Sequence, residues 1–180
     1  MKVAISGKRE ISFKTKLMCF NLGKLIGKLN HNLICGGAKG VDYWVSKGFL
    51  ASKSDRSLNI IIPIDKNNGM NILLPKIYRK LVESNRGRVS VYKTIHEPYF
   101  SIKQQFALRN EDIVANSDVC IVAGKIGIGS QYFWEYGIKM RKSLIHLTNE
   151  SVSKKFGRIV SNDIRKLYKE VRSFSKVEIV

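Results

Sequence analysis

Short apolar runs alternate with amphipathic segments along most of this chain. The runs have the length of strands, and the segments between them place apolar residues three or four positions apart, as on one face of a helix. The clearest segment has this spacing at Met18, Leu22, Leu25, Ile26 and Leu29. Six strands are predicted, over residues 2–6, 33–35, 58–64, 86–93, 118–123 and 143–147. Helices are predicted over residues 15–29, 41–53, 75–84, 103–116 and 131–141.

This alternation predicts βαβ units, and therefore an α/β fold with a Rossmann-like parallel sheet and helices on both of its faces. The isoleucine-rich run from Leu58 to Ile64 suits a strand buried on both faces, and we expect it near the centre of the sheet. Loops are expected at residues 67–71 and around Pro98. The alternation spans residues 1–150, which we interpret as one domain.

Residues 151–180 follow a different pattern, which predicts a basic C-terminal helical extension. Ile164, Leu167, Tyr168 and Val171 form an apolar stripe, so the helix should dock either on its own domain or on a partner. Residues 177–180 could add an edge strand.

Charge is the next informative property. The chain has 32 Lys and Arg against 14 Asp and Glu, a formal net charge of +18. Such an excess favours a polyanionic partner, although a compositional bias of the source would also produce it. Because the basic residues are spread along the chain, folding must assemble any binding surface. Peripheral contacts are expected from Lys76, Arg79, Lys80, Arg165, Lys169 and Arg172.

The cysteines and histidines indicate neither disulfides nor metal. Cys19, Cys35 and Cys120 lie in apolar patterns without C-x-x-C spacing, so we expect buried free thiols in a reducing, intracellular compartment such as cytoplasm or nucleoid, with an organelle matrix as an alternative. His31, His96 and His146 lack metal-ligand spacing. We predict no cofactor, no secretory signal and no membrane-spanning segment.

Glycine-rich turns after predicted strands carry the candidate chemistry. Glycines there allow close backbone approach, and helix N-terminal amides attract phosphate. Asp42 lies in the first turn of the helix after the second strand, where an acid suits the helix dipole. The carboxyl ends of parallel strands meet at one edge of a sheet. The phosphate-binding residues predicted there are Gly7, Lys8, Arg9, Gly36, Gly37, Ala38, Lys39, Gly40, Arg109, Asn110, Gly127, Gly129 and Ser130.

The order of these motifs resembles the DprA/Smf group of the SLOG superfamily of Rossmann-like proteins. Residues 3–9 are similar to the opening strand and Gly-x-Arg turn of that group, and residues 36–42 to its Gly-x-Ala-(Arg/Lys)-Gly-(Ile/Val)-Asp signature. Further likeness lies in Leu74, Pro75 and Leu81, in Phe106 to Asn110 and in Gly129-Ser130. The resemblance implies a domain that is often dimeric and that in DprA holds single-stranded DNA and serves recombinase loading.

Two acidic residues depart from related patterns. Glu111 stands where the group usually has a second arginine, and a carboxylate there would repel phosphate. LOG-type nucleotide hydrolases place a glutamate three residues after a threonine, whereas Glu135 comes five residues after Ser130. Two extra helical residues rotate a side chain by about 200°. Unless the loop absorbs them, Glu135 lies on the wrong face for hydrolysis.

The sequence thus favours a non-catalytic protein that holds single-stranded DNA or RNA at the carboxyl edge of the sheet. Tyr43, Trp44, Tyr99 and Phe100 are candidate stacking residues, with burial in the core as the alternative. A structural RNA-binding component of a ribonucleoprotein, such as a ribosome, is a second function, and a LOG-like nucleotide-binding or N-glycosidic enzyme a third.

Overall fold

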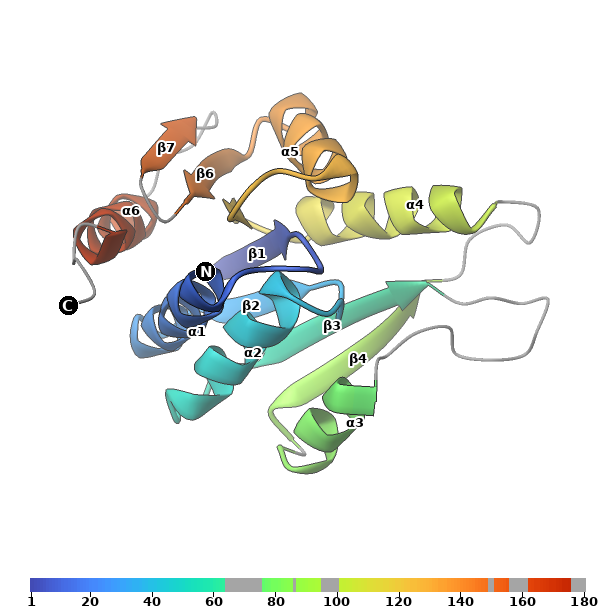
Figure 1. The fold of residues 1–180 in the computed structure, drawn as a ribbon, viewed down its shortest axis with the longest axis horizontal. Helices are drawn as coiled ribbons and strands as arrows, with labels where there is room; N and C mark the ends of the chain where they lie inside the picture. The colour runs from blue at the N-terminus through green and yellow to red at the C-terminus, as the bar shows by residue number, and fades with distance from the viewer. Residues whose placement is uncertain (64–75, 86, 95–100, 149–150, 156–161, 176–180) are drawn as a thin grey trace.

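A single sheet of seven strands, in the order β4-β3-β2-β1-β5-β6-β7, organises the part of the chain described by the computed structural model (Figure 1). The described residues are 1–63, 76–85, 87–94, 101–148, 151–155 and 162–175. The strands are β1 (Lys2–Gly7), β2 (Asn32–Cys35), β3 (Leu58–Pro63), β4 (Val89–Thr94), β5 (Val119–Ala123), β6 (Ser143–Leu147) and β7 (Val152–Lys155). The helices are α1 (Phe13–Lys28), α2 (Val41–Ala51), α3 (Lys76–Glu83), α4 (Ile102–Ala115), α5 (Ile128–Lys139) and α6 (Asn162–Ser175).

Strands β1 to β6 are parallel, which confirms the predicted Rossmann-like fold, and β7 adds an antiparallel edge beside β6. The chain leaves β1 toward β2 on one side and returns to it through β5 on the other. The strand order therefore reverses between β1 and β5. In open parallel sheets, ligands bind at the carboxyl ends of the strands beside such a switch point.

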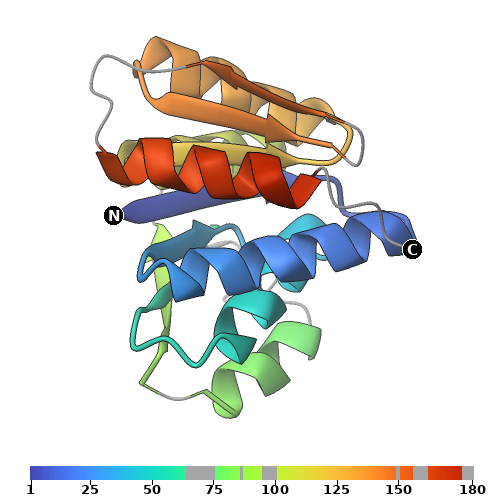
Figure 2. The same ribbon diagram turned by 90° about the vertical axis from the view of Figure 1, so that its left-hand side faces the viewer.

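Helices cover both faces of the sheet, and each face has its own apolar core. One core joins the sheet to α1, α2, α3 and α6, with Leu22, Phe49 and Tyr78 fully buried. The other joins it to α4 and α5 through Ile113, Val114 and Phe133. Figure 2 shows α6 lying alongside α1. The extension thus docks on its own domain, through Ile164, Leu167 and Val171.

Local sequence explains where several helices begin. The Ser12 side chain accepts a hydrogen bond from the Thr15 amide and caps α1. Ser101 and Gln104 form a reciprocal capping box at the start of α4. Glycines let α1 and α2 pack closely: a Cβ added at Gly48 would lie 1.8 Å from the Phe20 carbonyl oxygen.

The structure corrects three details. The isoleucine-rich strand β3 lies second from one edge, and β1 is central. β3 is nevertheless buried on both faces, because Ile60 and Ile62 belong to one core and Ile61 to the other. Helix α5 begins at Ile128 rather than residue 131, and β7 had no predicted counterpart. The expectations for residues 67–71, 95–100 and 177–180, and for Leu74 and Pro75, lie outside the described residues.

Candidate functional site

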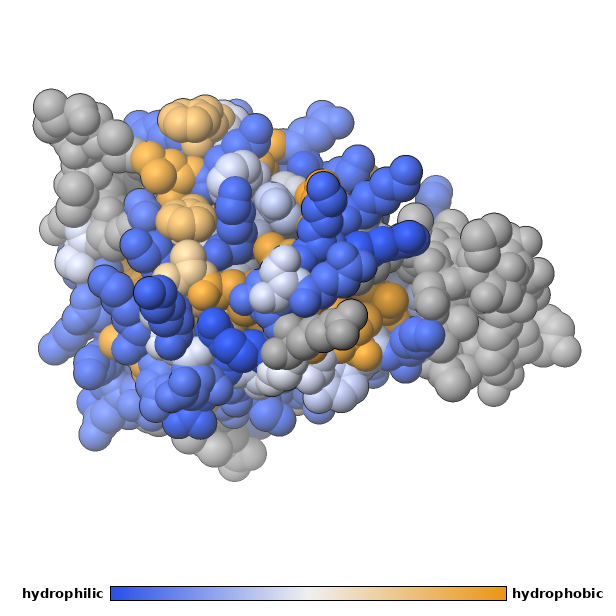
Figure 3. All heavy atoms as spheres, turned by 90° about the horizontal axis from the view of Figure 1, so that it is seen from below, coloured by the Kyte–Doolittle hydropathy of each residue, from blue (hydrophilic) through white to orange (hydrophobic). Residues whose placement is uncertain are grey.

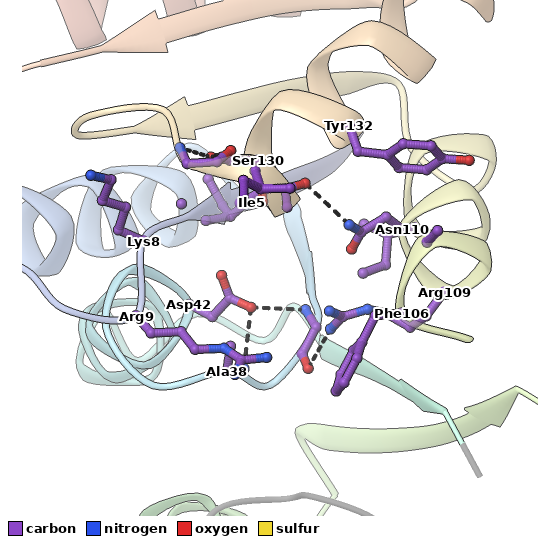
Figure 4. A pocket seen from close by; sticks show the side chains of 18 of the residues that line it. Ile5, Lys8, Arg9, Ala38, Asp42, Phe106, Arg109, Asn110, Ser130 and Tyr132 are labelled. Carbon is purple, nitrogen blue, oxygen red and sulfur yellow. Dashed lines mark hydrogen bonds between the residues drawn. The ribbon is translucent and has the colours of Figure 1, made fainter. Parts of the chain in front are cut away.

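A cavity of about 680 Å³ opens at the switch point between β1 and β5 (Figure 4). Its walls come from four separate segments: the end of β1 with the turn after it, the glycine-rich loop after β2 with the first turn of α2, one face of α4, and the start of α5. Lys8, Arg9 and Lys103 line it, together with the acidic Glu10 and the ring of Phe106. We call this cavity the switch-point pocket.

The glycine-rich loop wraps around a carboxylate that belongs to the protein itself. Oδ2 of Asp42 accepts hydrogen bonds from the backbone amides of Gly36, at 3.1 Å, and Ala38, at 3.2 Å. The next helix amide, that of Val41, donates to the Lys8 carbonyl oxygen. These two amides, which the sequence predicted to bind phosphate, thus donate to Asp42 instead. The two hydrogen bonds fix the conformation of the loop.

Burial dominates the electrostatics of Asp42. Removal from water raises the pKa of this carboxyl from 3.8 to about 6, against the opposing effects of the Arg109 guanidinium, the two loop amides and Arg9. Burial therefore disfavours the charged form of Asp42, and the nearby guanidinium groups and loop amides partly offset this effect.

Arg109 connects helix α4 to the glycine loop. Its Nη1 donates to the Gly36 carbonyl oxygen at 2.6 Å, and the side chain is only 7% exposed. A Cβ added at Gly36 would lie 1.5 Å from Nη1, so only glycine leaves room for this guanidinium. Nε of Arg109 is buried and has no hydrogen-bond partner among the described residues. The pocket wall thus retains an unused buried donor.

Two guanidinium groups lie close to the ring of Phe106. Cζ of Arg109 is 5.3 Å from the ring centroid and Cζ of Arg9 is 5.5 Å from it. Cation–π attraction holds Arg9 across the pocket against α4, although the two residues are distant in sequence.

The N-terminus of α5 forms the opposite wall. The hydroxyl of Ser130 accepts from the Gly127 amide at 2.8 Å and donates to the Gly127 carbonyl oxygen at 3.0 Å, which fixes the turn. Nδ2 of Asn110 donates to the Gly129 carbonyl oxygen at 3.2 Å and ties this turn to α4. The first-turn backbone of α5 therefore borders the cavity, where a helix N-terminus favours anions.

Most of the predicted phosphate-binding residues converge here, from segments far apart in the chain. Those lining the pocket are Gly7, Lys8, Arg9, Gly36, Ala38, Arg109, Asn110, Gly127, Gly129 and Ser130. Gly37, Lys39 and Gly40 do not line it. Gly40 has a φ of 79° and packs on the Lys8 and Arg9 carbonyl oxygens, so it shapes the loop from behind.

Sequence reasoning missed Lys103 as a pocket residue. Lys103, Phe106, Ala107 and Asn110 recur at helical spacing, so one face of α4 supplies them together. That spacing, extended backward from Asn110, was the signal that could have identified Lys103.

The six peripheral basic residues are exposed, and none lines the switch-point pocket. Lys76, Arg79 and Lys80 lie on α3. Arg165, Lys169 and Arg172 lie on α6, on the side of the molecule opposite the tips of β1 and β3 (Figure 1).

The two departing glutamates lie outside the pocket lining. Glu111 accepts a short hydrogen bond from the Tyr132 hydroxyl, an interaction that raises the pKa of Tyr132 to about 12. Glu135 is exposed and accepts from Nε2 of Gln131 at 2.9 Å. The position three residues after Ser130 is held by Phe133, which is fully buried. The loop therefore does not bring Glu135 to the place of a LOG-type glutamate.

The three cysteines are buried free thiols, as predicted. Burial raises the pKa of Cys19 and of Cys35 to about 12, and that of Cys120 to about 11, so the thiolate forms are disfavoured. Within the described ranges, no three His, Cys, Asp or Glu side chains are grouped as metal ligands. None of the described helices has the length and apolar character needed to cross a membrane.

Comparison with known proteins identifies the family. The SLOG cluster4 family model matches residues 1–178. The chain belongs to the SLOG cluster4 family. This confirms the predicted SLOG membership, and no curated protein matches the chain.

Solved structures agree with this SLOG assignment. DNA processing protein A (DprA) from Helicobacter pylori, described by its single-stranded DNA binding mode, has a TM-score of 0.66 and 22% identity, over 94% of this chain and 72% of that one. DprA from Streptococcus pneumoniae has a TM-score of 0.63 and 19% identity, over 94% and 56%. The molybdenum cofactor carrier protein of Chlamydomonas reinhardtii has a TM-score of 0.55 and 16% identity, over 82% and 76%. At these identities the likeness establishes the shared fold.

Proposed function

We propose that this SLOG protein binds single-stranded nucleic acid, with the phosphate backbone entering the switch-point pocket. The observation that carries the proposal is the convergence of Lys8, Arg9 and Lys103 on a cavity that also borders the N-terminus of α5. Ammonium, guanidinium and helix N-terminal amides are the groups that bind phosphate oxygens. They contact the backbone, so we expect little discrimination between base sequences.

Two further features support this proposal. The partly buried ring of Phe106 gives the pocket an apolar surface beside its cations, which suits an unpaired base next to its phosphate. The Helicobacter pylori protein with the same fold binds single-stranded DNA. The net charge of +18 would add long-range attraction to any such polyanion.

A nucleotide-sized ligand is the second candidate, because the cavity is a pocket rather than a flat surface. Its volume of about 680 Å³ lies within the usual range for small-molecule sites. A nucleoside phosphate would use the same cations and the same helix N-terminus. The two candidates differ in whether affinity grows with the number of linked nucleotides.

The first experiment measures fluorescence anisotropy of labelled single-stranded DNA, single-stranded RNA and duplex DNA at several salt concentrations. Replacing Lys8 and Arg9 together by alanine should weaken single-strand binding about tenfold and reduce the salt slope by about 1.4, since each lost phosphate contact removes about 0.7. A Lys2→Ala, Lys139→Ala protein is the matched control, because both lysines are exposed and neither lines the pocket.

Equal affinities of the Lys8/Arg9 variant and the control for single strands would refute the proposal. Calorimetry with nucleoside monophosphates tests the second candidate. Monophosphate binding as tight as that of an oligonucleotide would favour the nucleotide site. Weak binding to all three polymers that disappears at modest salt would favour a merely charged surface, as in a ribonucleoprotein component.

A further inference from the structure

The two helical layers differ strongly in charge. On one face of the sheet, α1 has four lysines and no acidic residue, α3 three basic residues and one acidic, and α6 four basic and two acidic. Between α1 and α3 on that face lies α2, with Lys47 exposed and Asp42, its acidic residue, buried. On the other face, α4 and α5 together have three basic and three acidic residues. The excess positive charge of the helices is therefore concentrated on one side of the molecule.

Two lysines on this basic side approach the same indole ring. Nζ of Lys47 lies 5.0 Å from the centroid of a Trp44 ring, and Nζ of Lys16, from α1, lies 6.0 Å from it. Trp44 is half-buried and contacts the ring of Tyr43 edge to face. An aromatic ring and two lysine ammonium groups thus lie close together on this side of the molecule.

A groove of about 490 Å³ continues from this cluster between α2 and α3. Tyr43 and Lys47 line it from α2, and Lys80 lines it from α3, above an apolar floor that includes Leu50 and Leu81. Figure 3 views the molecule from the side on which α3 lies and shows that its described surface is mostly hydrophilic, with small apolar patches. Aromatic and apolar surface flanked by cations is the arrangement that binds unpaired bases and their phosphates.

Helix α2 connects this groove to the switch-point pocket. Its first turn contains Asp42, which lines the pocket, and its later turns contain Lys47 and Leu50, which line the groove. The helix is 11 residues long, or about 16 Å. A strand that leaves the pocket along α2 meets Trp44 and then the groove, whereas a strand that leaves over α4 and α5 meets no excess of positive charge.

We propose that a surface along α2, consisting of Lys16, Tyr43, Trp44, Lys47 and Lys80, binds the continuation of the single strand whose end lies in the switch-point pocket. This inference rests on the proposed function and adds the path of the strand to it. The ligand is unpaired nucleic acid, because a duplex hides the base faces that Tyr43 and Trp44 would contact.

The test compares oligothymidylates of about four and about twenty nucleotides, lengths near the lower limit and above the upper limit of single-strand site sizes. The variant replaces Lys47 and Lys80 by glutamine. It should bind the long oligonucleotide about tenfold more weakly, with a salt slope smaller by about 1.4, and bind the short one as the parent does. A Lys2→Gln, Lys139→Gln protein is the matched control, since it also loses two exposed lysines and neither of them lines the pocket or the groove.

The inference is overturned if the Lys47/Lys80 variant binds the long oligonucleotide as tightly as the Lys2/Lys139 control does, or if its affinity for the short oligonucleotide falls by the same factor. A duplex or vesicles of acidic phospholipid that compete more strongly than the long single strand would also overturn it. Failure of the proposed function has a different signature, in which the Lys8/Arg9 variant binds both lengths as the parent does.

Discussion

At the scale of single residues, Asp42 and Arg109 fix the glycine loop that forms one wall of the pocket. The acid was expected only to favour a helix dipole, yet its carboxylate closes the glycine loop through the Gly36 and Ala38 amides. Arg109 holds the same loop from α4. Both side chains are buried and both hydrogen-bond to the glycine loop, so the conformation of the loop depends on whether the Asp42 carboxyl is protonated.

The pH dependence of stability should report this link. Because the folded-state pKa of Asp42 is about 6, above its ordinary 3.8, the folded state favours the neutral acid. Its contribution to stability is full below pH 3.8 and is lost as the pH rises through about 6. Asp42→Asn keeps an oxygen acceptor for the two amides and removes the titration, so its melting temperature should depend less on pH over this range.

The measurement is thermal unfolding of parent and variant between about pH 4 and pH 7. Asp55→Asn, which changes an exposed aspartate, serves as the control and should keep the parental dependence. Identical pH profiles of the Asp42 variant and the parent would show that Asp42 does not carry the effect.

At the scale of elements, the contact between α1 and α2 depends on glycine. A Cβ at Gly48 would lie 1.8 Å from the Phe20 carbonyl oxygen, and one at Gly23 would lie 2.0 Å from that of Val45. These neighbours are backbone atoms, so the helices themselves would have to separate. The separation would also move Lys16 relative to Trp44.

Gly48→Ala should therefore destabilise the protein by about 3 kcal/mol, the upper part of the range for overpacking. Gly129→Ala is the matched control in a helix, because a Cβ there meets nothing within 4 Å. That change should be neutral or slightly stabilising. Urea unfolding of both variants gives the comparison, and equal stabilities would contradict the close-packing argument.

The sequence predicted most elements correctly because amphipathic spacing and buried apolar runs are local signals. It failed where the signal was not local. Gly127 and Gly129 read as a turn, but Ser130 fixes that turn from inside the helix, so α5 begins earlier. Strand β7 has only four residues, three of them polar, and only their pairing with β6 makes them a strand.

In the candidate site, too, local features could be predicted from the sequence and contacts between distant segments could not. Glycine turns after strands could be placed at one edge of the sheet from topology alone. Two other features depend on how the folded chain packs. Asp42 accepts hydrogen bonds from two of the loop amides, and Arg9 lies against the ring of Phe106. Periodicity in one sequence does not encode such contacts.

At the scale of the whole molecule, the basic extension is part of the main core. Leu167 and Val171 of α6 are fully buried in the same cluster as Leu22 of α1 and Ile145 of β6. This shared packing indicates that residues 1–150 and α6 fold as one unit, and the division of the chain into residues 1–150 and 151–180 remains a proposal.

Leu167→Ala tests this view. If residues 1–150 and α6 unfold together, the variant should lose about 2–5 kcal/mol in one cooperative transition, the usual cost of removing a buried leucine side chain. Arg165→Ala, an exposed change on the same helix, should have little effect. Urea unfolding followed by circular dichroism and by tryptophan fluorescence distinguishes the cases. Separate transitions, with the tryptophan signal unchanged, would indicate an independent extension.

The central position of β1 has a consequence for synthesis of the protein. Val3 pairs with Leu33 on one side and with Val119 on the other. Because β2 follows β1 closely in the chain and β5 comes much later, β1 gains one partner early in synthesis and the other only after α4 has been made. During that interval, an apolar strand offers an unpaired edge to other chains. The switch-point pocket, whose last wall is α5, is completed only after this interval.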